Sequence, residues 1–398
     1  MNQPLSDQLR RSAKLAAPGF ALWNLGFRPF YLLASVFSTL SVPLWVAQFS
    51  GWLPSAYLQG PLWHGHEMLF GFTLAVVAGF LLTAVRAWTG QPTAVGAPLM
   101  ALAALWVTGR ILVLTSWSIA SAIVNAAFPL ALAIAIAIPL LRARNVRNYF
   151  FVGLLALMSV LVAALHLALL DIAILPPRLD LVLGLDVMLF IMAVMGGRVI
   201  PMFTNNGVPG TRAARHPLVE KLALVAVLLL FLADAFRLQP VLVAAIALLA
   251  AVAHGARLIL WRPWRTLSTP LVWILHAAYA WIVVHLALRG LSAMAWAGSS
   301  FAVHALTVGA IGGLTLGMMT RTARGHTARP LIADRYELTC FLLIQMAAVV
   351  RVFGGMVSSS LYLPSVQASG ILWAAAFGLY AVRYWPVLSR PRLDGKAG

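Results

Sequence analysis

The sequence predicts an all-α, polytopic membrane protein of about 12 transmembrane helices in a single bundle, with both termini in the cytoplasm. Three observations support this fold class. Hydrophobic residues make up 62% of the 398 residues and charged residues only 10%, whereas soluble domains have a charged fraction of about 25%. The chain contains successive apolar runs of membrane-spanning length, and its basic residues fall mainly between alternate runs.

Each predicted helix is an apolar run of about 20 residues, the length that crosses the hydrocarbon core of a bilayer. In order, the runs lie near 29–49, 62–85, 96–115, 119–141, 149–170, 180–203, 217–237, 240–261, 269–288, 295–320, 335–357 and 366–388. The loops between them are too short for a soluble domain. We therefore expect a cytoplasmic segment at 1–28, one transmembrane domain at 29–388 and a cytoplasmic tail at 389–398.

The positions of the basic residues test the helix count. With a cytoplasmic N-terminus, 23 of the 28 Lys and Arg residues fall in inner segments, and a wrong count would scramble this asymmetry. The five on the outer side are Arg110, Arg178, Arg237, Arg289 and Arg351. Because orientation in the bilayer accounts for the net charge of +18, we expect a lipid environment and no nucleic-acid partner.

The segment Trp63–Met68 is the first candidate site, because two histidines and a carboxylate open a predicted span there. Ionisable groups at membrane depth are costly, so they mark functional sites by default. His304 opens another span from the same, outer side. Imidazoles from separate helices, without cysteine ligands, suit haem iron or copper. We expect His304 to share a haem with His64 or His66.

Helix geometry limits how the 64–66 pair can act. Two residues apart on a helix, His64 and His66 point about 200° apart, so either they serve different partners or His64 precedes the first turn. We expect Glu67 to be a proton carrier or a hydrogen-bond partner of His66, or simply a cap of the first turn. The aromatic residues expected to wall the haem are Trp63, Phe70 and Phe72.

Small residues recur at helical spacing on the two histidine helices. Gly309, Gly313 and Gly317 share one face, which would admit either a partner helix or a flat macrocycle. Glycine spacing by itself does not distinguish these two readings.

At this point several blocks of the sequence resemble the NnrS family. They are Asn24–Phe30, Trp63–Gly71, Gly197–Thr204, His304–Gly309 and the run from Met318 to Thr327. The resemblance implies a twelve-helix protein of the bacterial inner membrane that contains haem b and copper and is associated with nitric oxide, denitrification and nitrosative stress. It carries over His64, His66, His304 and His326 as motif histidines, with His276 as a further candidate. More distantly, the layout resembles the main subunit of haem-copper oxidases, although predicted helix 6 has no histidine.

Four arginines are candidate cofactor-binding residues. Guanidinium groups offer bidentate hydrogen bonds to carboxylates such as haem propionates. Arg110 and Arg351 lie in outer halves of predicted spans, where the alternative is snorkelling to the interface. Arg28 and Arg198 lie in two of the family blocks.

The inner side carries its own histidine motif. Sixteen residues of helix separate His304 from position 320, about 24 Å, so His326 lies too far from His304 to share one metal. We expect His326 either to serve a second, inner-side site that binds copper together with His276, or to anchor its loop.

The predicted function is binding of nitric oxide or a related diatomic molecule at a histidine-ligated metal near the outer side, with Glu67 as the candidate catalytic residue. Whether the molecule is also reduced is left open, and electrons would come from quinol or a donor protein. The alternative is a twelve-helix secondary transporter or channel with a polar midplane site and no metal. Such carriers have internal repeats, and residues 1–205 and 206–398 show none.

Overall fold

The computed structural model describes residues 19–52, 58, 60–174, 176 and 178–396, and within these residues it contains helices and no strands. The α-helices are α2 (Phe27–Phe49), α3 (Gly60–His66), α4 (Leu74–Thr89), α5 (Ala97–Leu112), α6 (Ser118–Arg142), α7 (Phe150–Leu169), α8 (Leu179–Gly207), α9 (Pro217–Ala235), α10 (Pro240–Leu260), α11 (Pro270–Ala293), α12 (Ser299–His304), α13 (Gly313–His326), α14 (Arg335–Val357) and α15 (Tyr362–Ser389). Two π-helical segments are η1 (Glu67–Thr73) and η4 (Ala305–Gly312), and the 3₁₀ segments are η2 (Val146–Asn148), η3 (Pro263–Arg265) and η5 (Ser359–Leu361).

Every predicted span coincides with a helix or with a continuous run of helical segments. In the described part of the chain, ten of these are long and apolar enough to cross a membrane, which makes the protein a multi-pass membrane protein. The other two are α5, with 16 residues, and α9, whose 19 residues include Glu220, Lys221 and Asp234. The count of 12 spans and the cytoplasmic location of the termini stay predictions, and residues 1–18 of the predicted N-terminal segment lie outside the described residues.

The two histidine helices share an unusual construction. α3, η1 and α4 form one rod over Gly60–Thr89, and α12, η4 and α13 form another over Ser299–His326. In each rod the π-helical segment begins directly after a histidine, at His66 and at His304. Because π-helical turns are rare and concentrate at functional sites, both rods are modified at the same place, next to their histidines.

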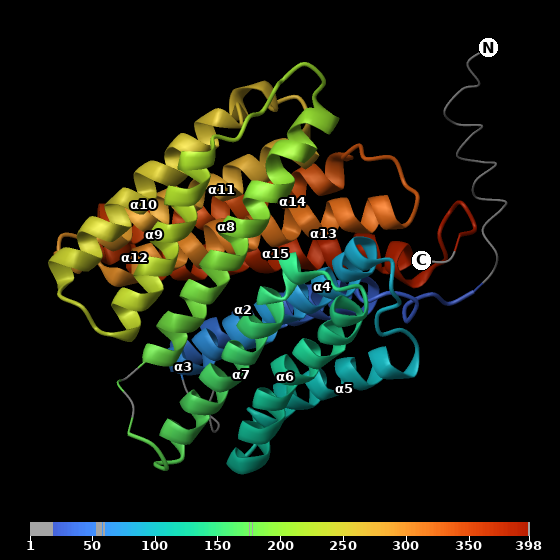
Figure 1. Cartoon of the computed structure of the whole chain (residues 1–398). Helices are drawn as coiled ribbons and strands as arrows, with labels where there is room; N and C mark the ends of the chain where they lie inside the picture. The colour runs from blue at the N-terminus through green and yellow to red at the C-terminus, as the bar shows by residue number, and fades with distance from the viewer. Residues whose placement is uncertain (1–18, 53–57, 59, 175, 177, 397–398) are drawn as a thin grey trace.

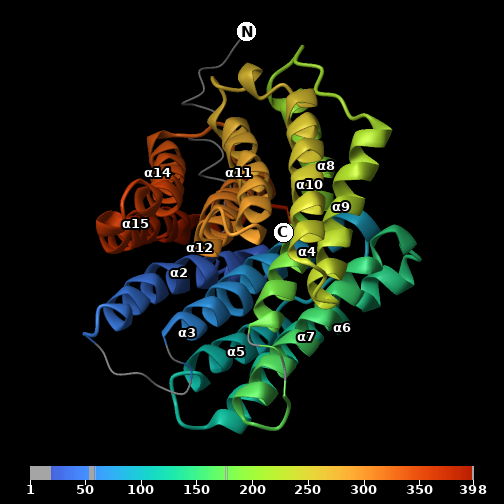
Figure 2. The same cartoon turned by 90° about the vertical axis from the view of Figure 1, so that its left-hand side faces the viewer.

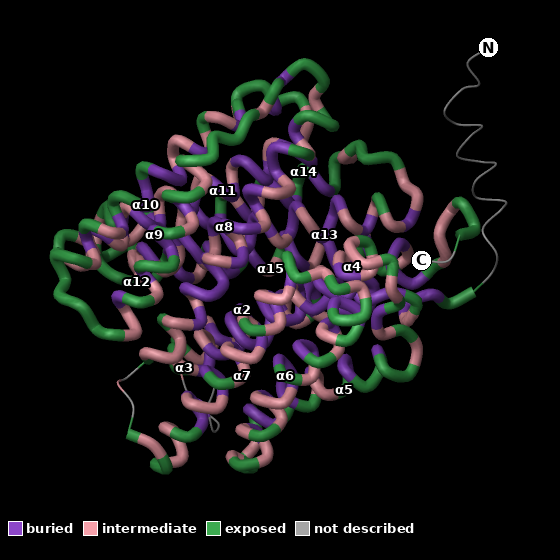
Figure 3. Tube along the Cα trace, in the orientation of Figure 1, coloured by how far each residue is buried: buried purple, intermediate pink, exposed green. Residues whose placement is uncertain are grey.

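The first and last described helices lie side by side (Figures 1 and 2). α15 packs against both α2 and α14, and the backbone N–H of Ala21 donates to the carbonyl of Ser389 at 2.7 Å. Figure 3 shows buried residues running along the inner faces of the helices, with exposed residues on the loops and outer faces. The chain therefore closes on itself at the end of the bundle where α2 begins.

The glycine face of the second histidine rod packs against α11. A Cβ atom at Gly309 would collide with Trp281, one at Gly313 would lie 2.6 Å from the Cβ of Ala278, and one at Gly317 would lie 2.9 Å from Leu275. These glycines therefore serve close packing between helices, the first of the two readings that their spacing allowed.

Candidate functional site

A cavity of about 430 Å³ lies at the end of the bundle where the two histidine rods begin. Its walls come from the end of α2, the starts of α3, α8, α12 and α15, the segments η1 and η4, and the end of α14. Both His64 and His304 line it. The structure therefore brings together the two histidines that the sequence placed on one side, in a cavity of the size that holds a small molecule or cofactor.

The rings of His64 and His304 are arranged as a pair. Their centroids are 6.5 Å apart and their planes differ by 10°. Two imidazoles that share one metal ion through bonds of about 2 Å place their ring centroids about 6 Å apart. The observed distance between the His64 and His304 centroids, 6.5 Å, is close to this value.

The hydrogen bond of His304 fixes which of its nitrogens is available. Nδ1 lies 2.7 Å from the backbone carbonyl oxygen of Ser300. Because a carbonyl can only accept, Nδ1 carries the proton and Nε2 keeps its lone pair. Histidine ligands of metals usually donate their other ring N–H in this way. On His64, Nδ1 is buried without a hydrogen-bond partner among the described residues.

A cationic group completes one side of the cavity. Arg351 lines it, is 5% exposed, and donates from one terminal nitrogen to the Ser300 hydroxyl at 3.2 Å. Its guanidinium carbon lies 5.4 Å from the centre of the Tyr362 ring, while its Nη1 is buried without a partner in the described structure. Arg178, exposed at the start of α8, lines the same cavity. An anionic group in the cavity would find unsatisfied donors here.

The aromatic wall differs from the predicted one. Of the three predicted residues, only Phe72 lines the cavity, because Phe70 instead packs against the ring of His66 at 5.4 Å and Trp63 is not part of the lining. Trp45 of α2 takes their place and stacks on His64, with ring centroids 4.3 Å apart. Trp63 and Phe70 do not line the cavity, because residues at different positions on a helix face different directions. Trp45 of the neighbouring helix α2 provides an aromatic ring in their place.

His66 belongs to a separate cluster, as the angle between neighbouring positions on the helix implied. Its ring centroid lies 5.1 Å from that of His166 on α7. Nδ1 is 2.8 Å from Oε1 of Glu67, which also accepts from Nη1 of Arg110 at 2.6 Å. His64 and His66 therefore serve different partners, although both lie inside α3. Glu67 orients His66 rather than capping the helix, and it does not line the cavity.

Arg110 is held inside the protein by this cluster. It is 8% exposed and donates both to Glu67 and to the side-chain oxygen of Asn125. Glycine at position 71 makes room for it, since a Cβ atom there would lie 2.5 Å from Nη1 of Arg110. Arg110 does not line the cavity. Its predicted contact with a cofactor stays a prediction, and its observed contact is with Glu67.

The remaining predicted site residues lie at the opposite end of the bundle or along its inner half. Arg28 donates to the backbone carbonyls of Leu388 and Arg390 at 2.8 and 2.7 Å. Arg198 donates to Asn148 at 2.7 Å. Neither lines the 430 Å³ cavity.

His276 and His326 have separate surroundings. Nε2 of His276 lies 2.8 Å from the hydroxyl of Thr204, whereas the His326 ring packs 5.7 Å from the ring of Phe27. Across the described residues there is no group of three or more His, Cys, Asp or Glu side chains arranged to hold a metal ion. A shared inner-side metal for these two histidines stays a prediction.

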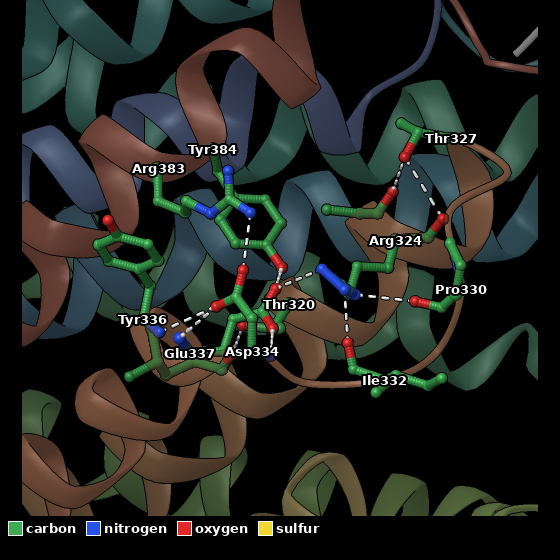
Figure 4. Close-up of polar contacts among 12 residues, drawn as sticks. Thr320, Arg324, Thr327, Pro330, Ile332, Asp334, Tyr336, Glu337, Arg383 and Tyr384 are labelled. Carbon is green, nitrogen blue, oxygen red and sulfur yellow. Dashed lines mark hydrogen bonds and ion pairs between the residues drawn. The ribbon is translucent and has the colours of Figure 1, made fainter. Parts of the chain in front are cut away.

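The basic motif beside His326 takes part in a network of hydrogen bonds, shown in Figure 4. Arg324 donates to Glu337 at 2.7 Å and to backbone carbonyls of its own loop, and Tyr384 donates to the same carboxylate at 2.5 Å. Arg383 donates to Asp334 at 2.7 Å. These contacts tie the ends of α13, α14 and α15 together, which is an anchoring role for the motif.

Two further groups of buried and half-buried charges form ion pairs that the sequence analysis did not predict. Arg257 pairs with Glu220 through two hydrogen bonds of 2.9 and 2.5 Å, joining α10 to α9. Arg289 pairs with Asp186 at 2.5 Å and also with Asp234, joining α11 to α8 and α9. Charges inside a membrane bundle are retained when paired, and neither arginine lines the 430 Å³ cavity.

Comparison with known protein families gives one match. The model of a family described as NnrS protein matches residues 21–392, nearly the whole chain. No curated protein matches the chain.

Proposed function

Because this chain belongs to the NnrS family of nitric oxide-related membrane proteins, we propose that it is a haem-binding protein of the bacterial inner membrane that binds nitric oxide or a related diatomic molecule. The observation that carries the proposal is the pairing of His64 with His304 across a single cavity. Iron held by imidazole supplies the chemistry of diatomic binding. The protein supplies the ligands, the walls and the charge around them.

Each cavity residue has a role in this proposal. His64 and His304 would hold the iron, and the carbonyl of Ser300 keeps His304 in the tautomer that exposes Nε2. Trp45 stacks on His64 and limits rotation of its ring. Arg351, with a buried and unsatisfied Nη1, would bind a propionate carboxylate.

The two histidines are held to different degrees. No described residue accepts a hydrogen bond from Nδ1 of His64, whereas Nδ1 of His304 donates to the carbonyl of Ser300. Of the two residues that would hold the iron, His304 is therefore the one whose orientation is fixed by a hydrogen bond within the described structure.

Neither a copper site nor a catalytic role for Glu67 is part of the proposed function. The described residues offer no cluster of three metal ligands, and Glu67 acts as a positioning residue for His66. Reduction of two nitric oxide molecules to nitrous oxide and water consumes two electrons and two protons. Quinol or a donor protein would have to supply the electrons.

Absorption spectra of purified variants test the proposal. The wild-type chain, produced in haem-replete cells, should show a Soret band and bind nitric oxide with a spectral shift. His304→Ala should lose the band, and His64→Ala should shift it. His166→Ala is the control, because His166 is a buried histidine that does not line the cavity. A colourless wild-type protein, or equal loss of the band in all three variants, would contradict the proposal.

A further inference from the structure

A second cavity, of about 110 Å³, lies beside the first in the middle of the bundle. It is lined by α2, the end of η1, α4, α8, α11, the end of η4 and the start of α13, and it is partly open. Its lining includes Val76, Phe80, Met188, Met192, Ile200 and Leu314. None of the histidines or arginines discussed above reaches it.

The chemistry of its walls excludes water. The threonines that line it turn their hydroxyl groups to their own helices: Thr73 donates to the carbonyl of Met68 at 2.7 Å, and Thr315 to that of Gly312 at 3.1 Å. The hydroxyl of Tyr31 is the one other polar side-chain group in the lining. A buried water needs two to four polar partners, and apolar cavities without them stay dry and accept apolar guests such as xenon.

The two cavities share two lining residues. Thr73 and Ile311 belong to both linings. They lie nine and seven residues beyond His64 and His304, which is about 10 to 14 Å along each rod. Both also lie on the π-helical segments that follow the histidines. The π-helical segments η1 and η4 therefore form the partition between the two cavities.

The outer wall of the small cavity is less buried than its inner wall. Val77, Phe80, Met192 and Val199 are half-buried, while Val76 and Leu275 are buried. These half-buried side chains lie on two helical runs, Gly60–Thr89 and Leu179–Gly207, that are long and apolar enough to cross a membrane. Small uncharged gases dissolve in lipid, so this wall gives them a short path inward.

We infer that the 110 Å³ cavity is a binding site for a small uncharged gas molecule, which passes from the lipid to the His64–His304 cavity across the Thr73–Ile311 partition. The gas site stands on the size and polarity of the cavity. Its delivery role rests on the proposed function, because it requires a gas-binding centre beyond the partition.

Xenon provides a probe that needs no metal. Crystals of the full chain pressurised with xenon should show xenon within the lining of the small cavity. Val76→Phe, which fills the cavity, and Met192→Trp, which blocks its half-buried wall, should each abolish that peak. Val252→Phe on the exposed face of α10 is the matched control and should retain it. No xenon in the wild-type cavity, or a lipid or detergent chain in its place, would overturn the inference.

The delivery role has a separate kinetic test. Carbon monoxide rebinding after flash photolysis should slow about tenfold in Val76→Phe, which fills the small cavity and does not line the larger one, while the Soret band stays unchanged. Val252→Phe should rebind at the wild-type rate. An unchanged rate in Val76→Phe would overturn the delivery role and leave the haem in place. A wild-type protein without haem would instead defeat the proposed function, and the xenon experiment would still decide whether the gas site exists.

Discussion

At the scale of single residues, the ion pair between Glu67 and Arg110 should contribute strongly to stability. Both side chains are buried, and Arg110 has one other side-chain partner, Asn125. Removing one member of a buried pair leaves an uncompensated charge and costs about 3–5 kcal/mol. We therefore expect Glu67→Gln to lower the unfolding temperature in detergent. In the double variant Glu67→Gln, Arg110→Met, part of the loss should be recovered; additive losses would contradict the pairing.

Arg351 should matter for haem binding rather than for the fold. Its Nη1 is buried without a hydrogen-bond partner in the described structure, its other terminal nitrogen donates to Ser300 at 3.2 Å, and its guanidinium lies 5.4 Å from the centre of the Tyr362 ring. Loss of a charge-assisted contact with a carboxylate costs at least about 1.4 kcal/mol, which is tenfold in affinity. Arg351→Leu should therefore release haem to apomyoglobin about tenfold faster or more. Arg198→Leu, at a site remote from the cavity lining, should release it at the wild-type rate, and equal rates in both variants would favour simple snorkelling of Arg351.

Part of this site could be predicted from the sequence. His64, His304 and Arg351 could be found because ionisable residues are rare in apolar runs and their depth follows from the topology. Of the five arginines predicted to lie on the outer side, four have contacts that the topology argument did not consider. Arg110 and Arg289 are ion-paired, and Arg178 and Arg351 line the cavity. Ser300 and Trp45 could not be found, because their contacts depend on how separate helices meet.

At the scale of helices, close packing makes some glycines irreplaceable and leaves others replaceable. A Cβ atom at Gly313 would lie 2.6 Å from the Cβ of Ala278, and neither group can rotate away. We expect Gly313→Ala to destabilise the protein by about 1–3 kcal/mol. Gly153 of α7 has no atom within 4 Å of such a position, so Gly153→Ala should be neutral or stabilising by up to about 1 kcal/mol. Thermal unfolding of both variants in the same detergent checks the contrast, and equal melting temperatures would contradict it.

The start of α14 should respond to pH through its N-cap. Asp334 accepts hydrogen bonds from the backbone N–H groups of Tyr336 and Glu337, and Glu337 accepts from the N–H of Asp334. Burial acts to raise the pKa of Asp334, but the hydrogen bond from Arg383 and the backbone donors outweigh it and lower the pKa below its ordinary value. The charged form is therefore favoured by folding.

The lowered pKa of Asp334 predicts how the stability of the protein should depend on pH. The stabilisation by Asp334 is complete above the unfolded pKa, about 3.9, and is lost as the pH falls through the lower folded value. Asp334→Ala should reduce stability by about 0.5–2 kcal/mol at pH 7. Because protonation of Asp334 weakens the cap of the wild type, and the variant has no such cap to lose, the difference in stability between wild type and variant should shrink below pH 4. A difference that grows in acid, measured by thermal unfolding across pH 3–7, would contradict this account.

The helices themselves were predictable and their internal irregularities were not. The predicted run at 217–237 corresponds to α9 (Pro217–Ala235), and that at 335–357 to α14 (Arg335–Val357), because prolines and charged residues end apolar runs sharply. Nothing in the composition of Glu67–Thr73 or Ala305–Gly312 marks a π-helix. Wider turns depend on the packing around a helix, which a single sequence does not display.

At the scale of the whole molecule, the closure between the first and last helices should govern global stability. Arg28 is fully buried and donates to the carbonyls of Leu388 and Arg390, which lie at the end of α15. These carbonyls belong to the end of a helix, where four carbonyl groups lack partners within the helix. One side chain near the beginning of the transmembrane domain therefore satisfies groups at its end, about 360 residues later.

Replacing Arg28 by methionine keeps much of the volume but leaves both carbonyls without this donor. A buried acceptor without a partner costs about 1–3 kcal/mol, so Arg28→Met should lower the unfolding temperature and expose the segment after Ser389 to protease before the rest of the chain. Arg390→Ala is the control, because that side chain is exposed and only its backbone carbonyl takes part. If Arg28→Met and Arg390→Ala unfold and are cleaved alike, the contact does not hold the bundle closed; if only Arg28→Met is cleaved early, the two ends of the chain are stabilised through this one side chain.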